Sequence, residues 1–127
     1  MPLLPAILSG GLVPPYETTM ARLVVNGLPL DEKRDLLNTF GDESGLAYRA
    51  MVLGTAGIPG QPFAGPVLCL SGDADRLVPQ RTAEAIARMY AARHEVFHGG
   101  HWLIAPSVAH EVVPRALAWL EEMVGHA

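Results

Sequence analysis

The chain has 127 residues, of which 50% are hydrophobic and 17% are charged, and its formal net charge is −4 at pH 7. This length suits one domain with a sizeable core, and the high apolar content excludes a disordered chain. The acidic balance, without any run of lysine or arginine, argues against a nucleic-acid partner.

The lone cysteine, Cys69, leaves no internal disulfide, so we expect a reducing, cytoplasmic location. No apolar run approaches the roughly 18 residues that a membrane span requires. The apolar start of the chain, MPLLPAILSGG, has no basic leader and is interrupted by proline, which argues against a signal peptide. We therefore expect no membrane partner.

Glycines and prolines divide residues 1–65 into short helices with no clear strand. Helices are expected from residue 16 to 26, after an Asp31 N-cap and after a Ser44 N-cap. Their apolar stripes are Met20, Leu23 and Val24, then Leu36, Leu37 and Phe40, then Ala47, Ala50 and Met51. The stretch 57–66, with three glycines and three prolines, indicates a linker.

Residues 66–127 have a different pattern, in which strands and helices alternate. Val67–Leu70 is a short apolar run after a proline, typical of a strand buried on both faces, and His94–Phe97 indicates a second strand. The helix between them is expected over residues 80–92. Its apolar stripe is Ala83, Ile86, Ala87 and Tyr90. Short connections of this kind predict a βαβα unit with parallel strands.

The last predicted helix starts at a Ser107 N-cap and ends before Gly125. Its inner face is expected to carry Val113, Leu117, Leu120 and Val124. Pro114 lies inside this helix and predicts either a kink or a fresh first turn.

Two loops that leave the predicted strands hold the residues of chemical interest. The segment GDADRLVP, residues 72–79, follows the first strand, and HGGHW, residues 98–102, follows the second. In parallel sheets, functional groups gather on the loops at the carboxyl ends of the strands. We therefore expect Asp75 and His101 to lie together there.

Residues 66–127 resemble the C-terminal end of an α/β-hydrolase-fold enzyme, a family whose catalytic triad runs Ser, Asp or Glu, then His along the chain. The matching residues are Gly72, Asp75 and Pro79 in the acid motif G-x-x-D-x-x-x-P, and Gly100, His101 and Trp102 in the histidine loop. Residues 16–54 resemble the helical cap that such enzymes insert before the acid-bearing strand. The resemblance implies an α/β fold with a cap-like region and linker over residues 1–65.

The resemblance assigns His101 the role of general base and Asp75 the role of the carboxylate that orients it. Asp73 competes for the acid role, although directly after Gly72 its side chain can simply organise the turn. The implied activity is hydrolysis of a small carboxylic ester or related acyl compound, without a cofactor and without a metal.

The nucleophile of such a triad is missing, because the chain contains no G-x-S-x-G string. Ser9, in ILSGG, comes closest, but Ile7 stands where the first glycine belongs. Ser71 is too near Asp75 along the chain to approach His101 from the required side. The other candidates are expected to be structural, with Ser44 and Ser107 as helix caps and Cys69 as a small core residue.

Two other interpretations concern the same parts of the chain. His94, His98 and His101 suggest a metal site, but no second cluster with ligand spacing supports it. A set of apolar side chains fits either an acyl pocket or, as we favour, ordinary helix packing. This set is Met20, Leu23, Leu36, Leu37 and Met51.

The sequence thus predicts a hydrolase relative that keeps the acid and base of a triad but does not catalyse triad hydrolysis by itself. Either it is a truncated hydrolase, or it is a stand-alone binding or oligomerisation module. Only two strands are expected, and a two-stranded sheet is marginal alone and leaves an open edge. We therefore expect a homo-oligomer, with Val67–Leu70 or residues 1–54 at the contact.

Overall fold

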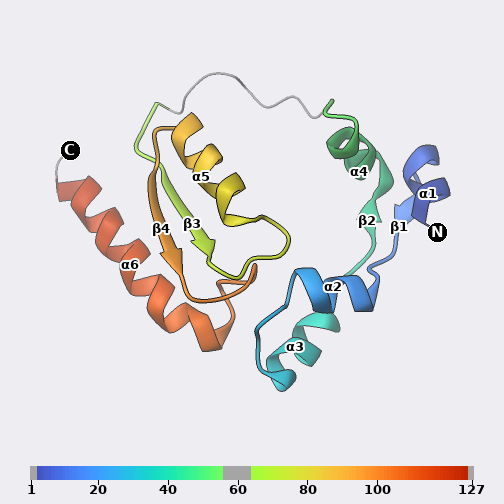
Figure 1. Cartoon of the computed structure of the whole chain (residues 1–127), viewed down its shortest axis with the longest axis horizontal. Coiled ribbons are helices and arrows are strands. Elements are labelled where there is room, and N and C mark those ends of the chain that lie inside the picture. The colour runs from blue at the N-terminus through green and yellow to red at the C-terminus, as the bar shows by residue number, and fades with distance from the viewer. Residues whose placement is uncertain (1–2, 56–63, 126–127) are drawn as a thin grey trace.

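The computed structural model describes residues 3–55 and 64–125. Within these residues the chain is a mixed α/β protein with six helices and two small two-stranded sheets, one antiparallel and one parallel. Figure 1 shows the antiparallel sheet among the N-terminal helices and the parallel sheet among the C-terminal helices. The expected mixed α/β class is confirmed. No helix in the described ranges combines the length and the apolar content needed to cross a membrane.

The parallel sheet pairs β3 (Leu68–Gly72) with β4 (Arg93–Phe97). α5 (Gln80–Met89) connects the two strands, and α6 (Pro106–Gly125) follows β4. The predicted strands, their parallel pairing and the helix between them are confirmed. The expected burial of the first strand on both faces is wrong, because only the last two residues of β3 are buried. Within the described residues, β3 pairs with β4 alone, so its other edge is open.

The two helices of this unit cover opposite faces of the parallel sheet. Cys69 on β3 contacts the carbonyl of Ala83 in α5, and its register partner is His94. Glu95, the next residue of β4, instead forms an ion pair with Arg115 of α6. Because successive side chains of a strand alternate between faces, α5 and α6 lie on opposite sides.

The N-terminal elements are α1 (Leu3–Ser9), β1 (Leu12–Val13), α2 (Glu17–Leu23), α3 (Leu30–Leu37), β2 (Glu43–Ser44) and α4 (Gly45–Val52). The three predicted helices are present as α2, α3 and α4, whereas α1 and the ladder between β1 and β2 were missed. Pro5 lies in the first turn of α1, where proline is tolerated, and a two-residue strand has no periodicity to detect. The predicted linker, residues 57–66, lies mostly outside the described residues.

A buried cluster joins the two parts of the chain. Val24, Val25 and Leu28, which follow α2, pack with Ala105, which precedes α6. Partly buried side chains surround this cluster: Met20, Ala21, Leu23, Leu36, Leu37, Phe40, Trp102 and Val108. The packing role favoured for the methionine and leucines of α2 and α3 is confirmed, whereas Met51 of α4 is 61% exposed.

Of the three predicted N-cap residues, one caps its helix and two do not. Ser44 caps α4 as expected, since its Oγ accepts the N–H of Ala47 at 3.3 Å. Asp31 instead lies inside the first turn of α3, where Pro29 holds the N-cap position. Ser107 lies inside α6 rather than at its cap.

The start of α6 is capped by a side chain from another helix. Oε1 of Glu32, in α3, accepts the N–H of Ser107 at 3.0 Å, and Oε2 accepts the Ser107 hydroxyl at 2.7 Å. A carboxylate at this place satisfies an unpaired N–H group and interacts favourably with the helix dipole. Glu32 therefore ties α3 to α6.

The face of α6 that meets the sheet is not the predicted one. Val113, Leu117, Leu120 and Val124, expected to point inward, are 49%, 53%, 49% and 76% exposed. The inward side chains are the buried Val112 and the partly buried Ala116, Trp119 and Met123. Both sets have helical spacing, and periodicity alone cannot choose between two adjacent apolar stripes. The helix also continues through Pro114 without a fresh start.

Replacing Glu32 should loosen the start of α6. Glu32→Ala removes the acceptor of two Ser107 hydrogen bonds, and a charged acceptor of this kind contributes about 1–2 kcal/mol. We expect the free energy of unfolding to fall by that amount in urea denaturation. Asp31→Ala is the matched control, because Asp31 is exposed and lies in the same helical turn. Equal losses in the two variants would contradict the cap between helices.

Candidate active site

The two loops that leave β3 and β4 lie against each other along their backbones. The N–H of Asp73 donates to the carbonyl of Phe97 at 2.9 Å, which extends the parallel ladder beyond the strands. A Cβ atom on Gly72 would collide with the carbonyl oxygens of Gly99 and Gly100. The absence of a side chain at Gly72 therefore allows the two loops to approach this closely.

This approach brings Asp75 and His101 into contact, as expected from the sequence. Oδ2 of Asp75 lies 2.9 Å from Nδ1 of His101. Oδ1 of Asp75 accepts the backbone N–H groups of Leu77 at 2.8 Å and Val78 at 2.9 Å. The Asp75 side chain is 6% exposed and that of His101 is 32% exposed. The carboxylate is thus fixed by its own loop, while the imidazole ring still reaches solvent.

The second ring nitrogen of His101, Nε2, is left without a hydrogen bond among the described residues. A carboxylate at Nδ1 favours the tautomer that carries its proton there, which leaves the lone pair of Nε2 free to accept a proton. A pocket of about 180 Å³ lies beside the ring, and its walls include Leu70, Val78, Ile86 and Leu103. The arrangement can take a proton from a group placed at Nε2 and return it.

Asp73 serves the crossing of the loops rather than His101. Its Oδ1 accepts the N–H of Gly99 at 3.0 Å, and its Oδ2 lies 3.0 Å from Nδ1 of His98. The hydrogen bond with His98, followed by that from Gly99, lowers the pKa of Asp73. The same carboxylate raises the pKa of His98. Of the two competing acids, Asp75 contacts His101 and Asp73 holds the neighbouring turn.

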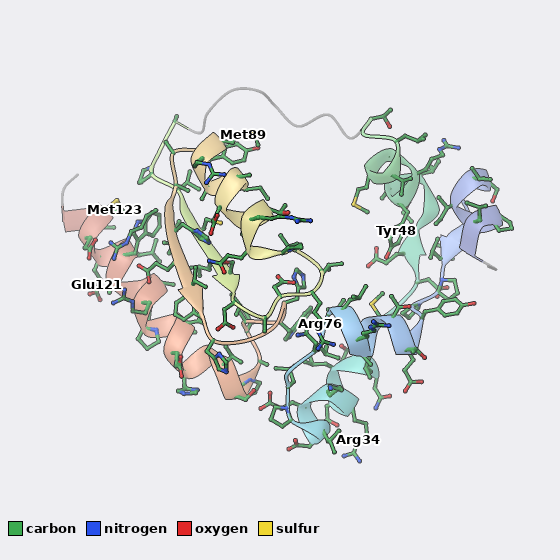
Figure 2. All side chains as sticks on the ribbon, in the orientation of Figure 1. Arg34, Tyr48, Arg76, Met89, Glu121 and Met123 are labelled. Atoms are coloured by element: carbon green, nitrogen blue, oxygen red, sulfur yellow. The ribbon has the colours of Figure 1, made fainter. Side chains whose placement is uncertain are left out.

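The N-terminal part of the chain closes over these loops through Asn26. Its Nδ2 donates to the carbonyl of Ala74 at 2.9 Å, and a Cβ atom on Gly100 would collide with the Asn26 carbonyl oxygen. Asn26 is 7% exposed, and its Oδ1 has no partner within the described part of the chain. Figure 2 shows Arg76, from the loop after β3, on the side that faces α2. Asn26 was not predicted from the sequence, although the Asn–Gly pair, with Gly27 at a φ of +81°, is a turn signal.

None of the candidate nucleophiles bonds Nε2 of His101. Oγ of Ser71 lies 2.8 Å from Nε2 of His94 instead. The other candidate serines also form their hydrogen bonds with groups other than His101. These serines are Ser9, Ser44 and Ser107. Burial raises the pKa of the Cys69 thiol, which disfavours the reactive thiolate. In the described residues the Asp75–His101 pair therefore has no candidate nucleophile bonded to it.

Each of the three histidines considered as metal ligands contacts a different side chain. The pairs are His94 with Ser71, His98 with Asp73 and His101 with Asp75. No group of three or more potential metal ligands converges within residues 3–55 and 64–125.

A comparison with models of protein families finds no match for the chain, and neither curated proteins nor solved structures show one. The relationship to α/β hydrolases is therefore a hypothesis that rests on the residues and geometry of this chain alone.

The Asp73–His98 pair makes stability depend on pH in a defined direction. Because the pKa of His98 is raised on folding, its contribution is complete below the ordinary histidine value of 6.5 and is lost as the pH rises through the raised pKa. Because the pKa of Asp73 is lowered, its contribution is complete above 3.8 and is lost as the pH falls through the lowered pKa. The pair therefore stabilises the fold most between those two values.

A comparison of wild type with His98→Gln measures this contribution. We expect the difference in melting temperature to be largest near about pH 5 and to shrink above about pH 8. Its amplitude should be small, because both side chains face solvent. Thermal unfolding followed by circular dichroism gives the two melting temperatures. A difference that is the same at both pH values would contradict an ionic contribution.

Asp75→Asn should reverse the tautomer of His101. The asparagine amide can donate to Nδ1, which moves the ring proton to Nε2 and removes the free acceptor there. Nitrogen NMR of the histidine rings distinguishes the two tautomers. We expect the Nδ1–H form in wild type and the Nε2–H form in Asp75→Asn. Asp73→Asn is the control, since it keeps the Asp75 contact, and the same tautomer in all three proteins would refute the orienting role.

Proposed function

We propose that the chain is the acid- and base-bearing part of an α/β-hydrolase-type acyl hydrolase and does not hydrolyse esters through a triad by itself. In this proposal His101 is the general base and Asp75 orients it. The observation that carries it is their 2.9 Å contact, made between loops at the carboxyl ends of two parallel strands. The substrate class, a small carboxylic ester or related acyl compound, comes from the resemblance of residues 66–127.

The chemistry of the pair follows from its geometry. A hydroxyl placed at Nε2 of His101 loses its proton to the ring as its oxygen attacks the ester carbonyl. The carboxylate of Asp75 stabilises the resulting imidazolium without itself becoming protonated. The ring then returns the proton to the departing alkoxide oxygen, so His101 acts first as a base and then as an acid.

Two features favour this role over a purely structural pair. Asp75 uses its second oxygen on backbone N–H groups, so its orientation does not depend on His101. His101 has one ring nitrogen satisfied and the other unbonded among the described residues, beside a pocket. The neighbouring Asp73–His98 pair differs, since its histidine side chain is 91% exposed.

A non-catalytic binding or oligomerisation module is the second candidate. It is favoured by the absence of a G-x-S-x-G string from the sequence. In that case the contact between Asp75 and His101 would only hold two loops together. The two candidates differ in whether His101 accelerates acyl transfer once a nucleophile is supplied from solution.

An added alcohol therefore distinguishes the two candidates. With a simple alkyl ester, the leaving group is too poor for imidazole itself to displace, so His101 can act only as a base. We expect wild type to accelerate attack by methanol, supplied in excess, at least about tenfold over His101→Ala, below the roughly 10²–10⁴-fold of a fully assisted general base. Product formation, followed by chromatography, gives both rates.

Matched variants define the source of any acceleration. Asp75→Asn should lose most of it, whereas His98→Ala, which removes a histidine from the same loop, should keep it. A serine-directed phosphonate should leave the protein unlabelled in intact-mass measurements, which excludes a hidden nucleophile. Equal rates for wild type and His101→Ala would favour the binding module.

A further inference from the structure

A band of apolar side chains on α6 is only about half covered, or less, by the other described residues. This apolar flank consists of Val113, Leu117, Leu120 and Val124, whose exposed fractions run from 49% to 76%. No charged residue belongs to it. Contiguous exposed apolar patches on a soluble protein mark contact surfaces. The direction in which this flank faces follows from the ion pairs of α6.

The ion pairs of α6 locate the apolar flank. Arg115 pairs with Glu95 at 3.0 Å and Glu122 with Arg93 at 2.8 Å, and both partners belong to β4. At about 100° per residue, positions 115 and 122 lie roughly 180° around the helix from the apolar flank, with the sheet-facing residues between. The ionic side is directed toward β4, so the apolar flank is directed away from β4. In Figure 2, Glu121 lies on the outer surface of α6, away from the strands.

The unpaired edge of β3 also faces away from β4. The N–H of Arg93 donates to the carbonyl of Val67 at 3.0 Å, which sets the phase of the parallel ladder. In this phase alternate residues of β3 direct their backbone groups toward β4, while Leu68 and Leu70 direct theirs away. Within the described residues, β4 is the sole partner of β3. An open strand edge beside an apolar band is suited to the addition of another strand.

The exposed area of the chain leaves room for a further contact. Its accessible surface is 8783 Å² for a mass of 13.6 kDa. A compact monomer of this mass exposes about 6,600 Å². The whole chain, counted with the residues outside the described ranges, thus exposes roughly 2,200 Å² more than a compact monomer, and a stable interface of standard size takes about 800 Å² of each partner.

We propose that a second copy of this chain covers both features, in a two-fold dimer formed by the β3 edge and the apolar flank of α6. Two β3 strands pair antiparallel and create one four-stranded sheet. A two-fold axis perpendicular to this sheet keeps the same face up in both copies, so the two α6 helices lie side by side. Of the two contact regions expected from the sequence, Val67–Leu70 and residues 1–54, the dimer uses the first. It does not depend on the proposed activity.

The spacing of the apolar flank suits its own copy. Its members are 4, 3 and 4 positions apart, as in the a/d seam of a coiled coil. This spacing is the same in both directions, so an antiparallel copy presents the same row of side chains. Leu117 of one copy then lies opposite Leu120 of the other. Because the flank is uncharged, the contact brings no like charges together.

Sedimentation equilibrium of the full chain at low micromolar concentration tests the dimer. We expect twice the mass of one 13.6 kDa chain. Combining Leu117→Glu with Leu120→Glu should raise the dissociation constant at least roughly 100-fold, because central interface side chains dominate binding. Ala118→Glu is the control for each single change, since it adds one negative charge at an exposed position of α6 outside the flank and should stay dimeric.

Cross-linking and amide exchange locate the contact without relying on the glutamate variants. In a Cys69→Ser background, a mixture of Leu117→Cys and Leu120→Cys chains should form a disulfide faster than either chain alone. The amides of Leu68 and Leu70 should be protected from hydrogen exchange in the dimer.

Three results would overturn the proposal. A monomer at low micromolar concentration would leave the apolar flank for a different partner. A dimer that survives both glutamate changes would place the contact elsewhere, for example on residues 1–54. Cross-linking that is no faster in the mixture would exclude the antiparallel arrangement.

Discussion

The candidate site depends on the close backbone approach of the two loops after β3 and β4. That approach exists because Gly72 has no side chain where the carbonyls of Gly99 and Gly100 pass. A methyl group there would push the loops apart, since protein interiors leave no spare volume at such a crossing. The 2.9 Å contact between Asp75 and His101 spans these two loops, so it depends on the absence of a side chain at Gly72.

The sequence was sufficient for those features that local patterns encode. The apolar run before Gly72 and the stripe containing Ala83 and Ala87 predicted β3 and α5, and the two loop motifs predicted the contact of Asp75 with His101. It was insufficient where the partner lies far along the chain. Glu32 caps α6 at Ser107, 75 positions further along the chain, and Asn26 bonds Ala74, 48 positions further along. No local sequence pattern predicts either contact. The predicted inward face of α6 was wrong for the same reason, because the neighbouring elements decide which of two equivalent apolar stripes is buried.

Two Asp–His pairs sit side by side on the same loops, yet their surroundings differ. Asp73 and His98 meet in solvent, where the ion pair shifts both pKa values but is screened by water. Asp75 is shielded and held by backbone N–H groups, so it acts on His101 from a fixed position. The same two residue types thus serve attachment in one pair and orientation in the other. Burial makes the difference, and it is not encoded in the spacing of the two residues along the chain.

The chain separation of these contacts bears on the order in which the molecule folds. Asp75 and His101 are 26 positions apart, whereas the contact of Glu32 with Ser107 closes a loop of 75. Closing the longer loop costs about 1 kcal/mol more in chain entropy, and contacts between near neighbours form sooner. We therefore expect β3, α5 and β4, with the contact between Asp75 and His101, to form before the helices α2 and α3 dock onto the crossed loops. Slow opening of those helices in the native protein would expose Asn26 and the Ala74 carbonyl to solvent while leaving the imidazole and its carboxylate paired.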